Sequence, residues 1–147
     1  MLYSSKVHKV IWGTKNSTTL AITESPITST YQVIGFVNDM DLAIKANFNI
    51  SLTTGAGETA TSIFIKLEGS NDGVNYFAIP NEATTAGVST IVGKEIKIDT
   101  TAGATNYKIG YGLDTFYKSI KVSARSQGVT TNQPSLYVEC TTYDGDS

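Results

Sequence analysis

Few residues in this chain could act as a nucleophile or a general base. His8 is the single histidine and Cys140 the single cysteine, and they stand at opposite ends of the sequence. A Cys/His or Ser/His/Asp catalytic arrangement would have to use His8. No nucleophile-elbow pattern surrounds either residue. We therefore expect His8 to be structural, and we predict that the protein has no catalytic residue and is not an enzyme.

Oxygen-bearing side chains gather in two short segments that could attract a cation. Asn38, Asp39 and Asp41 resemble a fragment of a calcium loop, and Asn71 and Asp72 stand in a turn-like segment. A complete calcium loop needs further ligands and usually a glycine and a distal glutamate, and the first segment has neither. Asn and Asp also favour turns for reasons of backbone hydrogen bonding. We expect turns rather than metal sites in both places.

The sequence also lacks the motifs of other metal and cofactor sites. One cysteine cannot form an intramolecular disulfide, a zinc cluster or a CxxC redox pair. The glycines form neither the GxGxxG nor the GxxxxGK[ST] pattern that would hold a phosphate. With 13 acidic residues, chance pairs of carboxylates are inevitable, and the sequence marks none as the pair that glycoside hydrolysis requires. The sequence therefore predicts no cofactor and no metal.

Charge and hydropathy restrict the partners. The chain of 147 residues has a formal net charge of −2, Arg125 is its only arginine, and the lysines are scattered. Binding to phosphates needs clustered basic side chains, so we predict neither a nucleic acid nor an anionic membrane surface as partner. No stretch approaches the roughly 20 apolar residues of a membrane span, and the first residues lack a secretory signal. We expect synthesis and folding in a reducing cytoplasm.

Alternation of apolar and polar residues dominates the chain and predicts strands with one buried face. The clearest runs span residues 42–52, 62–68, 116–124 and 134–143, although Lys118 interrupts the third. The residues expected to face the core are Leu42, Ile44, Ala46, Phe48, Ile50, Leu52, Ile63, Ile65, Leu67, Phe116, Ile120, Val122, Leu136, Val138 and Cys140. Shorter strands are expected at residues 7–12, 18–23, 31–37, 74–79, 88–98 and 107–109.

Turn residues separate these runs at intervals of roughly ten residues. Gly73 ends an Asn-Asp-Gly sequence and can adopt the left-handed conformation of a tight hairpin. A longer loop is expected at residues 53–58, and residues 84–87 and 100–103 share the loop sequence Thr-Thr-Ala-Gly. Many short strands with such spacing predict an all-β fold, a single two-sheet antiparallel β-sandwich that is jelly-roll-like.

Residues 1–147 are expected to form one domain, in keeping with their number. Residues 1–25 are polar and lack long alternation, which predicts an extended arm that lies on a neighbouring subunit, with Trp12 docked there. Residues 143–147 are acidic and predict a flexible tail. A short helical turn is expected near Met40.

Two parts of the sequence resemble a known group of proteins. One is Leu67–Ile79, with a Gly-Ser-x-Asp-Gly-x-Asn-aromatic hairpin, and the other combines Phe116–Ala124 with Ser135–Glu139. They are similar to β-sandwich structural proteins of tailed bacteriophages, which include head decoration (cement) proteins and tail-associated proteins. The resemblance implies a non-enzymatic virion component that acts through protein–protein contacts. Its partners would be copies of itself, with a trimer favoured, and other virion proteins such as a major capsid protein.

The same hairpin also resembles discoidin-like and other carbohydrate-binding sandwiches, which often have Trp where this chain has Tyr76. The alternative function is therefore a carbohydrate-binding β-sandwich module, such as a receptor-binding part of a phage tail. It predicts exposed aromatic side chains beside Asn and Asp on one face or at one loop end of the sandwich. A third hypothesis, a hydrolase, would need His8 or a carboxylate pair in a cleft.

Overall fold

The long alternating runs form the long strands of the computed structural model, which describes residues 3–38, 40, 43–85, 88–93, 95–114 and 117–145. These strands are β6 (Ala43–Thr53), β7 (Thr61–Ser70), β13 (Ser119–Gln127) and β14 (Ser135–Gly145). The expected core residues that are confirmed as buried are Ala46, Phe48, Ile50, Leu52, Ile63, Ile65, Leu67, Ile120, Val122, Leu136, Val138 and Cys140. Ile44 is half-buried, and Leu42 and Phe116 lie outside the described residues.

Ten further strands complete the described chain, and several are only two residues long. They are β1 (Tyr3–Trp12), β2 (Thr14–Lys15), β3 (Ile22–Thr23), β4 (Ser25–Pro26), β5 (Gln32–Val37), β8 (Phe77–Ala78), β9 (Pro80–Thr85), β10 (Val88–Gly93), β11 (Glu95–Thr100) and β12 (Tyr107–Asp114). None of the described residues forms a helix that could cross a membrane.

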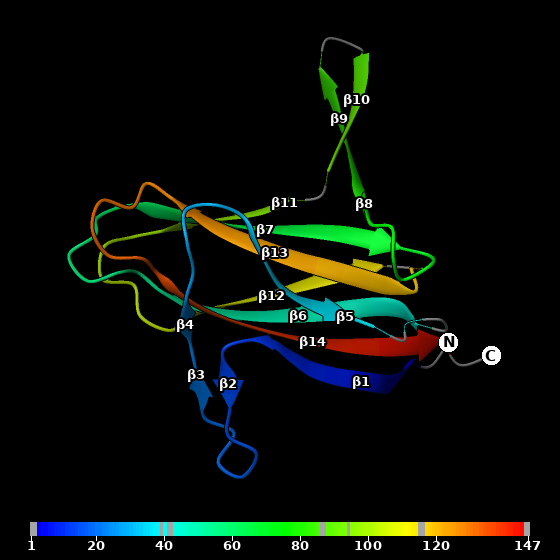
Figure 1. Cartoon of the computed structure of the whole chain (residues 1–147), viewed down its shortest axis with the longest axis horizontal. Helices are drawn as coiled ribbons and strands as arrows, with labels where there is room; N and C mark the ends of the chain where they lie inside the picture. The colour runs from blue at the N-terminus through cyan, green and yellow to red at the C-terminus, as the bar shows by residue number, and fades with distance from the viewer. Residues whose placement is uncertain are drawn as a thin grey trace.

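Two antiparallel sheets pack face to face, and the predicted β-sandwich is confirmed (Figure 1). One sheet has the order β1-β14-β6-β12, and the other has the order β11-β7-β13-β5. The pairs β1 with β14, β5 with β13, β6 with β12 and β7 with β11 are nested in sequence, as in one long hairpin that has been rolled up. This double Greek key is the topology of a jelly roll.

The core fills the space between the two sheets. Phe48, Ile50 and Leu52 of β6 belong to the same buried cluster as Ile63 and Ile65 of β7, in the opposite sheet. Burying a side chain of this size contributes roughly 1.5–3 kcal/mol, so these inward rows are the main source of stability.

The first strand corrects the expected N-terminal arm. Tyr3–Trp12 pairs with β14 along its whole length, from Tyr3 opposite Gly145 to Trp12 opposite Val138, and is an edge strand of this sandwich. Its alternation is hidden because register shifts interrupt the pairing between Ser5 and Val7 and between Val10 and Trp12. Trp12 packs against the core of its own chain and donates its indole N–H to Ser25 O, at 3.1 Å.

Several shorter expectations also need correction. The tail expected at residues 143–147 is wrong for Tyr143–Gly145, which belongs to β14: β1 pairs with all three residues and β6 with the first two. Residues 146 and 147 lie outside the described residues. Thr18 and Thr19 lie in a turn, where Asn16 Oδ1 accepts both of their N–H groups, and do not extend β3. The expected strand at residues 88–98 is two strands, β10 and β11, that pair with different partners. The helical turn predicted near Met40 involves Asp39 and Asp41, which lie outside the described residues.

A buried carboxylate ties two loops together at one end of the sandwich. Glu58, in the loop after β6, is only 4% exposed. Its oxygens accept hydrogen bonds from the backbone N–H groups of Thr130, Thr131 and Asn132 and from the hydroxyl of Thr130, all in the loop between β13 and β14. These bonds, above all those from the backbone, lower the pKa of Glu58 from 4.5 to about 2. The chain closes this end of the core by hydrogen bonding to an ionised side chain.

We expect Glu58→Gln to lower the melting temperature at neutral pH, because an amide NH₂ cannot accept the backbone N–H groups. Since the pKa of Glu58 is lower in the folded state, its stabilisation is complete above pH 4.5 and is lost as the pH falls towards 2. The melting temperatures of wild type and variant, measured from pH 7 to pH 2, should therefore converge in acid. Curves that stay parallel down to pH 2 would contradict this role.

Candidate functional site

The outward face of the sheet β1-β14-β6-β12 carries regular rows of polar side chains. The pairing of β14, β6 and β12 places Tyr137 beside Ser51 and Lys108, and Glu139 beside Asn49 and Gly110. The following rows are Thr141, Asn47 and Gly112, and then Tyr143, Lys45 and Asp114. We call this surface the outer face.

Two glycines on β12 open a trough in the outer face. Lys108, Gly110 and Gly112 occupy successive outward positions of the edge strand. Because two of them are glycines, no side chain of β12 stands beside Asn49 and Asn47. A cavity of about 500 Å³ has Asn49, Ser51, Lys108 and Gly110 in its lining. A second cavity, of about 300 Å³, adjoins it and shares Asn49 and Gly110. Together they form one elongated groove, which we call the outer-face groove.

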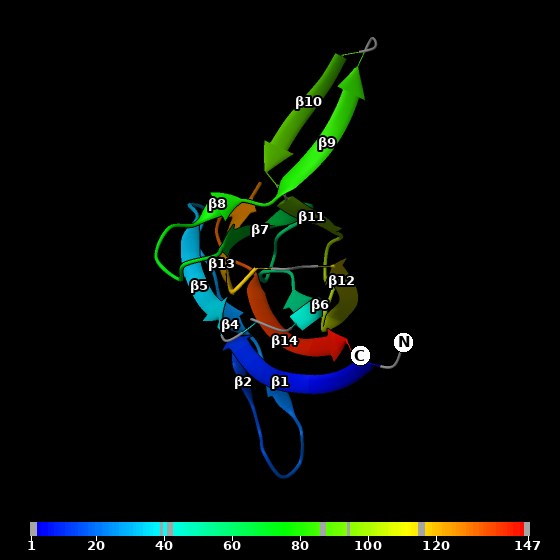
Figure 2. The same cartoon turned by 90° about the vertical axis from the view of Figure 1, so that its right-hand side faces the viewer.

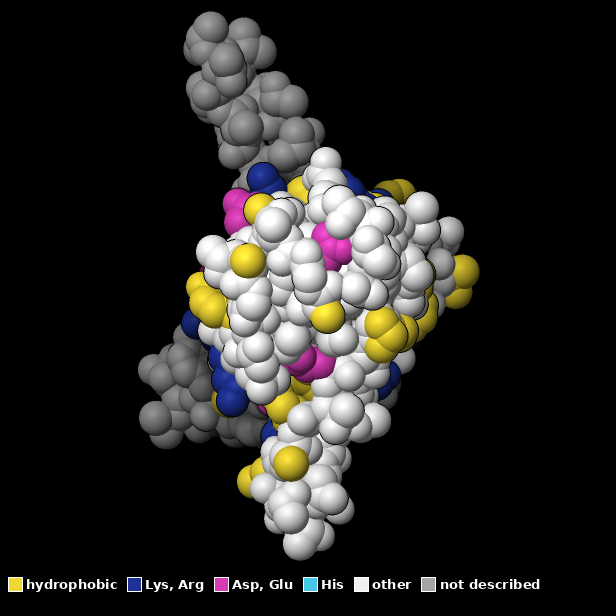
Figure 3. Space-filling model, turned by 90° about the vertical axis from the view of Figure 1, so that its left-hand side faces the viewer, with side chains coloured by type: hydrophobic (Ala, Val, Ile, Leu, Met, Phe, Trp, Pro, Cys, Tyr) yellow, Lys and Arg dark blue, Asp and Glu magenta, His cyan; other side chains and the backbone are white. Residues whose placement is uncertain are grey.

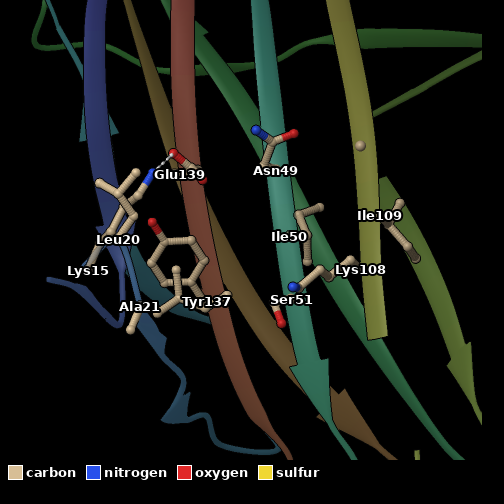
Figure 4. Close-up of a pocket in the computed structure, with 12 residues that line it drawn as sticks. Lys15, Leu20, Ala21, Asn49, Ile50, Ser51, Lys108, Ile109, Tyr137 and Glu139 are labelled. Carbon is tan, nitrogen blue, oxygen red and sulfur yellow. Dashed lines mark hydrogen bonds and ion pairs between the residues drawn. The ribbon is translucent and has the colours of Figure 1, made fainter. Parts of the chain in front are cut away.

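The β2–β3 hairpin forms one wall of the larger cavity (Figure 4). Lys15, Leu20, Ala21 and Ile22 of this segment line the cavity on the side of β14. The chain enters the hairpin at Gly13, which has φ +81° and where a Cβ atom would lie 2.5 Å from Thr23 O. Only glycine fits this conformation and this close approach, and it directs the hairpin over the ring of Tyr137.

Tyr137 lies beneath this wall and is the largest fully buried side chain of the described chain. Its hydroxyl is also buried, and within the described part of the chain it has no hydrogen-bond partner. Burial, with a smaller contribution from the nearby Glu139 carboxylate, raises the pKa of Tyr137. Because buried polar groups are nearly always paired, an unpaired hydroxyl at a cavity wall points to a missing partner.

Glu139 organises the polar side chains at this end of the groove. Its Oε2 lies 2.8 Å from Nε2 of His8 and 3.4 Å from Nζ of Lys15. When Nε2 donates to the carboxylate, Nδ1 of the neutral imidazole accepts from the Thr141 hydroxyl, at 2.8 Å. The negative charge of Glu139 is thus compensated from the chain itself.

His8 and Cys140 lie on adjacent strands but on opposite faces, so they form no catalytic pair. His8 is opposite Thr141 on the outer face, whereas Cys140 is buried in the core with 1% exposure. Burial raises the pKa of Cys140 to about 12, which keeps the thiol protonated and unreactive.

The row Thr141, His8 and Glu139 has the order of a hydroxyl, an imidazole and a carboxylate, but its surroundings do not suit acyl transfer. Acyl transfer needs backbone N–H groups aimed at the developing oxyanion. Thr141 lies on β14 between β1 and β6, and the sheet ladders on both sides use the backbone groups of this strand. The three side chains therefore fit a hydrogen-bonded row that positions Glu139.

The predicted turn residues are held within the chain. Asp72 accepts hydrogen bonds from the N–H groups of Val74 and Asn75 and from Ser70 Oγ. These bonds, with one from the side chain of Asn75, lower the pKa of Asp72. Asn38 accepts a hydrogen bond from Ser119, while Asp39 and Asp41 lie outside the described residues. Within the described ranges, no group of three or more His, Cys, Asp or Glu could hold a metal.

The outward face of the second sheet alternates basic, acidic and aromatic side chains. Lys121 and Lys66 lie 3.5 and 3.8 Å from Glu68. The guanidinium of Arg125 stacks on Phe64, 4.2 Å from the ring centroid, with Tyr31 at 5.1 Å. The end of the sandwich where the loops gather shows only scattered charged side chains among backbone and uncharged polar groups (Figure 3). Neither surface has the clustered charge of a phosphate-binding site.

The β9–β10 hairpin is a second candidate site, since it projects from the sandwich (Figures 1 and 2). Ala78 of β8 pairs with Glu68 of β7, and Ile79 N–H then bonds to Leu67 O. The next position along β7, Lys66, pairs with Glu95 of β11. The strand beside β7 is therefore continuous in space, and residues 80–94 are inserted at a single point within it.

Exposed apolar side chains lie near the base of this insertion. Phe77, in β8, is 72% exposed, and Val74, in the preceding turn, is 78% exposed. The turn that carries Val74 is fixed by Asp72 and by Gly73, which has φ +78°. Hydrogen bonds to Asp72 fix the turn that carries Val74, and pairing with Gly69 fixes Phe77 in β8. Both apolar side chains are therefore exposed on ordered backbone.

Comparisons with known proteins give little guidance. No protein-family model and no curated protein matches the chain. A solved structure of a Bacillus endospore appendage, from a family of disulfide-linked pili, is 10% identical over 99% of this chain and 88% of that chain, with a TM-score of 0.35. A cryo-EM structure of Mud Crab dicistrovirus is 9% identical over 98% of this chain and 68% of that chain, with a TM-score of 0.20. Both similarities are too low to support an argument about function.

Neither the groove nor the insertion was expected from the sequence. The groove depends on which residues become neighbours across β14, β6 and β12, and no local motif encodes that. One signal was present, since Gly110 and Gly112 alternate within a strand, where glycine often marks a close approach or an open space.

We expect Tyr137→Phe to leave the free energy of unfolding unchanged or to raise it by up to about 1 kcal/mol, because the hydroxyl that it removes is buried and has no partner in the described part of the chain. Chemical denaturation would measure this. Tyr76→Phe is the matched control, since its hydroxyl lies 2.8 Å from Ser119 Oγ and its loss should cost about 1 kcal/mol. Equal destabilisation in both variants would show that Tyr137 has a partner.

Proposed function

We propose that this protein is a structural component of a virus particle, such as a capsid decoration protein of a tailed bacteriophage, and that it acts through protein–protein contacts. Its partners would be further copies of the chain, in a trimer or another small oligomer, and a capsid protein. The phage-like segments at residues 67–79, 116–124 and 135–139 support the viral assignment.

The observation that carries this proposal is the insertion of residues 80–94. The strand formed by β8 and β11 needs no hairpin at this point, because Ile79 and Glu95 already take successive positions beside β7. A hairpin that projects from a point where the sheet is already continuous is best explained by contacts outside the chain.

The hairpin itself also favours a neighbour. β9 and β10 pair with each other from Pro80 opposite Gly93 to Thr85 opposite Val88, and in the described chain they form a sheet of two strands. A two-stranded hairpin alone is marginally stable in water, and its unpaired edges are templates for further pairing. Packing or strand addition on an adjacent subunit would stabilise it.

The exposed pair Val74 and Phe77 extends the same surface. Apolar and aromatic side chains at the base of the hairpin suit the centre of an interface, where charged residues are depleted. A non-enzymatic role agrees with this reading, because the sheet ladders on both sides of Thr141 use the backbone groups beside the hydroxyl–imidazole–carboxylate row. The low net charge of −2 is compatible with close packing of copies.

Quantitative mass spectrometry of virus particles purified from cells that make the protein would test the viral role. We expect the protein in a fixed ratio to the major capsid protein, and retained through a density gradient. Its absence from purified particles would refute the proposal.

Deleting residues 80–94, so that Ile79 joins Glu95 directly, should remove self-association and leave the sandwich folded. Circular dichroism and thermal melting would report the fold, and light scattering coupled to size exclusion would report the mass. A second variant replaces residues 81–93 by a Gly/Ser linker of equal length, and it should behave in the same way. A wild-type protein that is monomeric, or a deletion variant that keeps the wild-type mass, would contradict the role of the hairpin.

A further inference from the structure

The outer-face groove has a set of polar groups that can both donate and accept hydrogen bonds. Asn47 and Asn49 present carboxamides two positions apart on β6, and Gly112 and Gly110 leave room beside them. Ser51 adds a hydroxyl that already donates to Glu24, at 2.7 Å, and Tyr137 adds one that has no partner among the described residues. A ligand that fits this set must itself offer many groups that donate and accept.

The charges of the groove do not select an anion. Glu139 lies 3.4 Å from the ammonium group of Lys15 and 2.8 Å from the imidazole of His8, so its charge is compensated by Lys15 and it accepts a hydrogen bond from His8. Lys108 stands at the opposite side, on the edge strand β12. A strongly anionic ligand would meet the Glu139 carboxylate that lines the larger cavity, which disfavours it.

The hairpin wall adds an apolar surface to this polar floor. Leu20 lines the larger cavity, is 63% exposed and has φ +63°, a conformation that is uncommon for a bulky residue. Its backbone is held there, because Leu20 N–H donates to Asn16 O and Asn16 N–H donates to Ala21 O. The fold thus tolerates a strained backbone conformation at Leu20, which keeps an apolar side chain at the mouth of a polar cavity.

We propose that the outer-face groove binds a neutral carbohydrate chain. A sugar ring offers hydroxyls that both donate and accept, which suits the carboxamides, and a C–H face, which suits Leu20. The larger cavity, of about 500 Å³, lies within the roughly 300–1,000 Å³ of ligand pockets, and the adjoining one lengthens it as a chain ligand requires. The hydroxyl of Tyr137 would gain its partner from the ligand. This inference stands apart from the role of the β9–β10 hairpin.

The test uses the purified full chain on an array of immobilised oligosaccharides. The neutral probes are oligomers of glucose, galactose, mannose and N-acetylglucosamine, and the anionic probes are uronic acid oligomers and sulfated oligomers. We expect binding to at least one neutral series, followed by calorimetric titration with the tightest-binding oligomer. Binding only to anionic probes, or to no probe, would overturn the proposal.

Three variants locate the site. Asn49→Ala removes a carboxamide, and Gly110→Thr fills the groove, where a Cβ atom would meet only Asn49 Oδ1, at an ordinary 3.7 Å. Both should weaken binding at least tenfold while the melting temperature of Gly110→Thr stays at or above that of wild type, because threonine favours a strand. Tyr137→Phe should weaken binding at least threefold without loss of stability.

Asn71→Ala, in the exposed turn at the far side of the sandwich, is the matched control and should bind as wild type does. Unchanged affinity in Asn49→Ala and Gly110→Thr would place any carbohydrate elsewhere and refute the groove. Since the deletion of residues 80–94 does not touch the groove, that variant should retain the affinity even if it no longer self-associates.

Discussion

The whole molecule depends on one constraint, which is that the apolar rows of two sheets must face each other. A shift of one residue in any strand would turn its buried row towards water, so the register of the nested pairs is fixed by the core. The same register determines the outward rows, because successive side chains alternate between faces. The positions of Asn49 beside Glu139 and of Asn47 beside Thr141 are therefore a consequence of burying Phe48 and Ile50.

The sequence predicts the strands best where alternation is uninterrupted. β6, β7 and β14 were expected from their apolar rows, and so was the sandwich. The full length of β1 was not predicted, because two register shifts interrupt its alternation. In addition, a charged residue, Lys9, stands at the inward position opposite Cys140, where its side chain donates to Phe36 O. Residues 88–98 look like one run, yet they belong to a hairpin and to the sheet, and only the pairing partners distinguish the two.

Candidate sites were harder to predict than strands, for a physical reason. His8 and Cys140 could be judged as catalytic candidates because the chain has only one histidine and one cysteine. The structure places them on opposite faces of the same strand pair. Glu58 gave no signal, although the pKa of this group is shifted to about 2, since its donors lie some 70 positions away in the chain. Binding surfaces on a jelly roll arise from contacts between strands that are distant in sequence, and a local motif cannot encode them.

The point between Ile79 and Glu95 has a consequence for how this protein can vary. Because the chain leaves and rejoins the sheet at successive positions, segments of different length can be exchanged there without altering the core. Homologues could then differ in what they attach to while sharing one scaffold. For the same reason, a foreign peptide such as an epitope or an affinity tag could be displayed at this point on an otherwise unchanged sandwich.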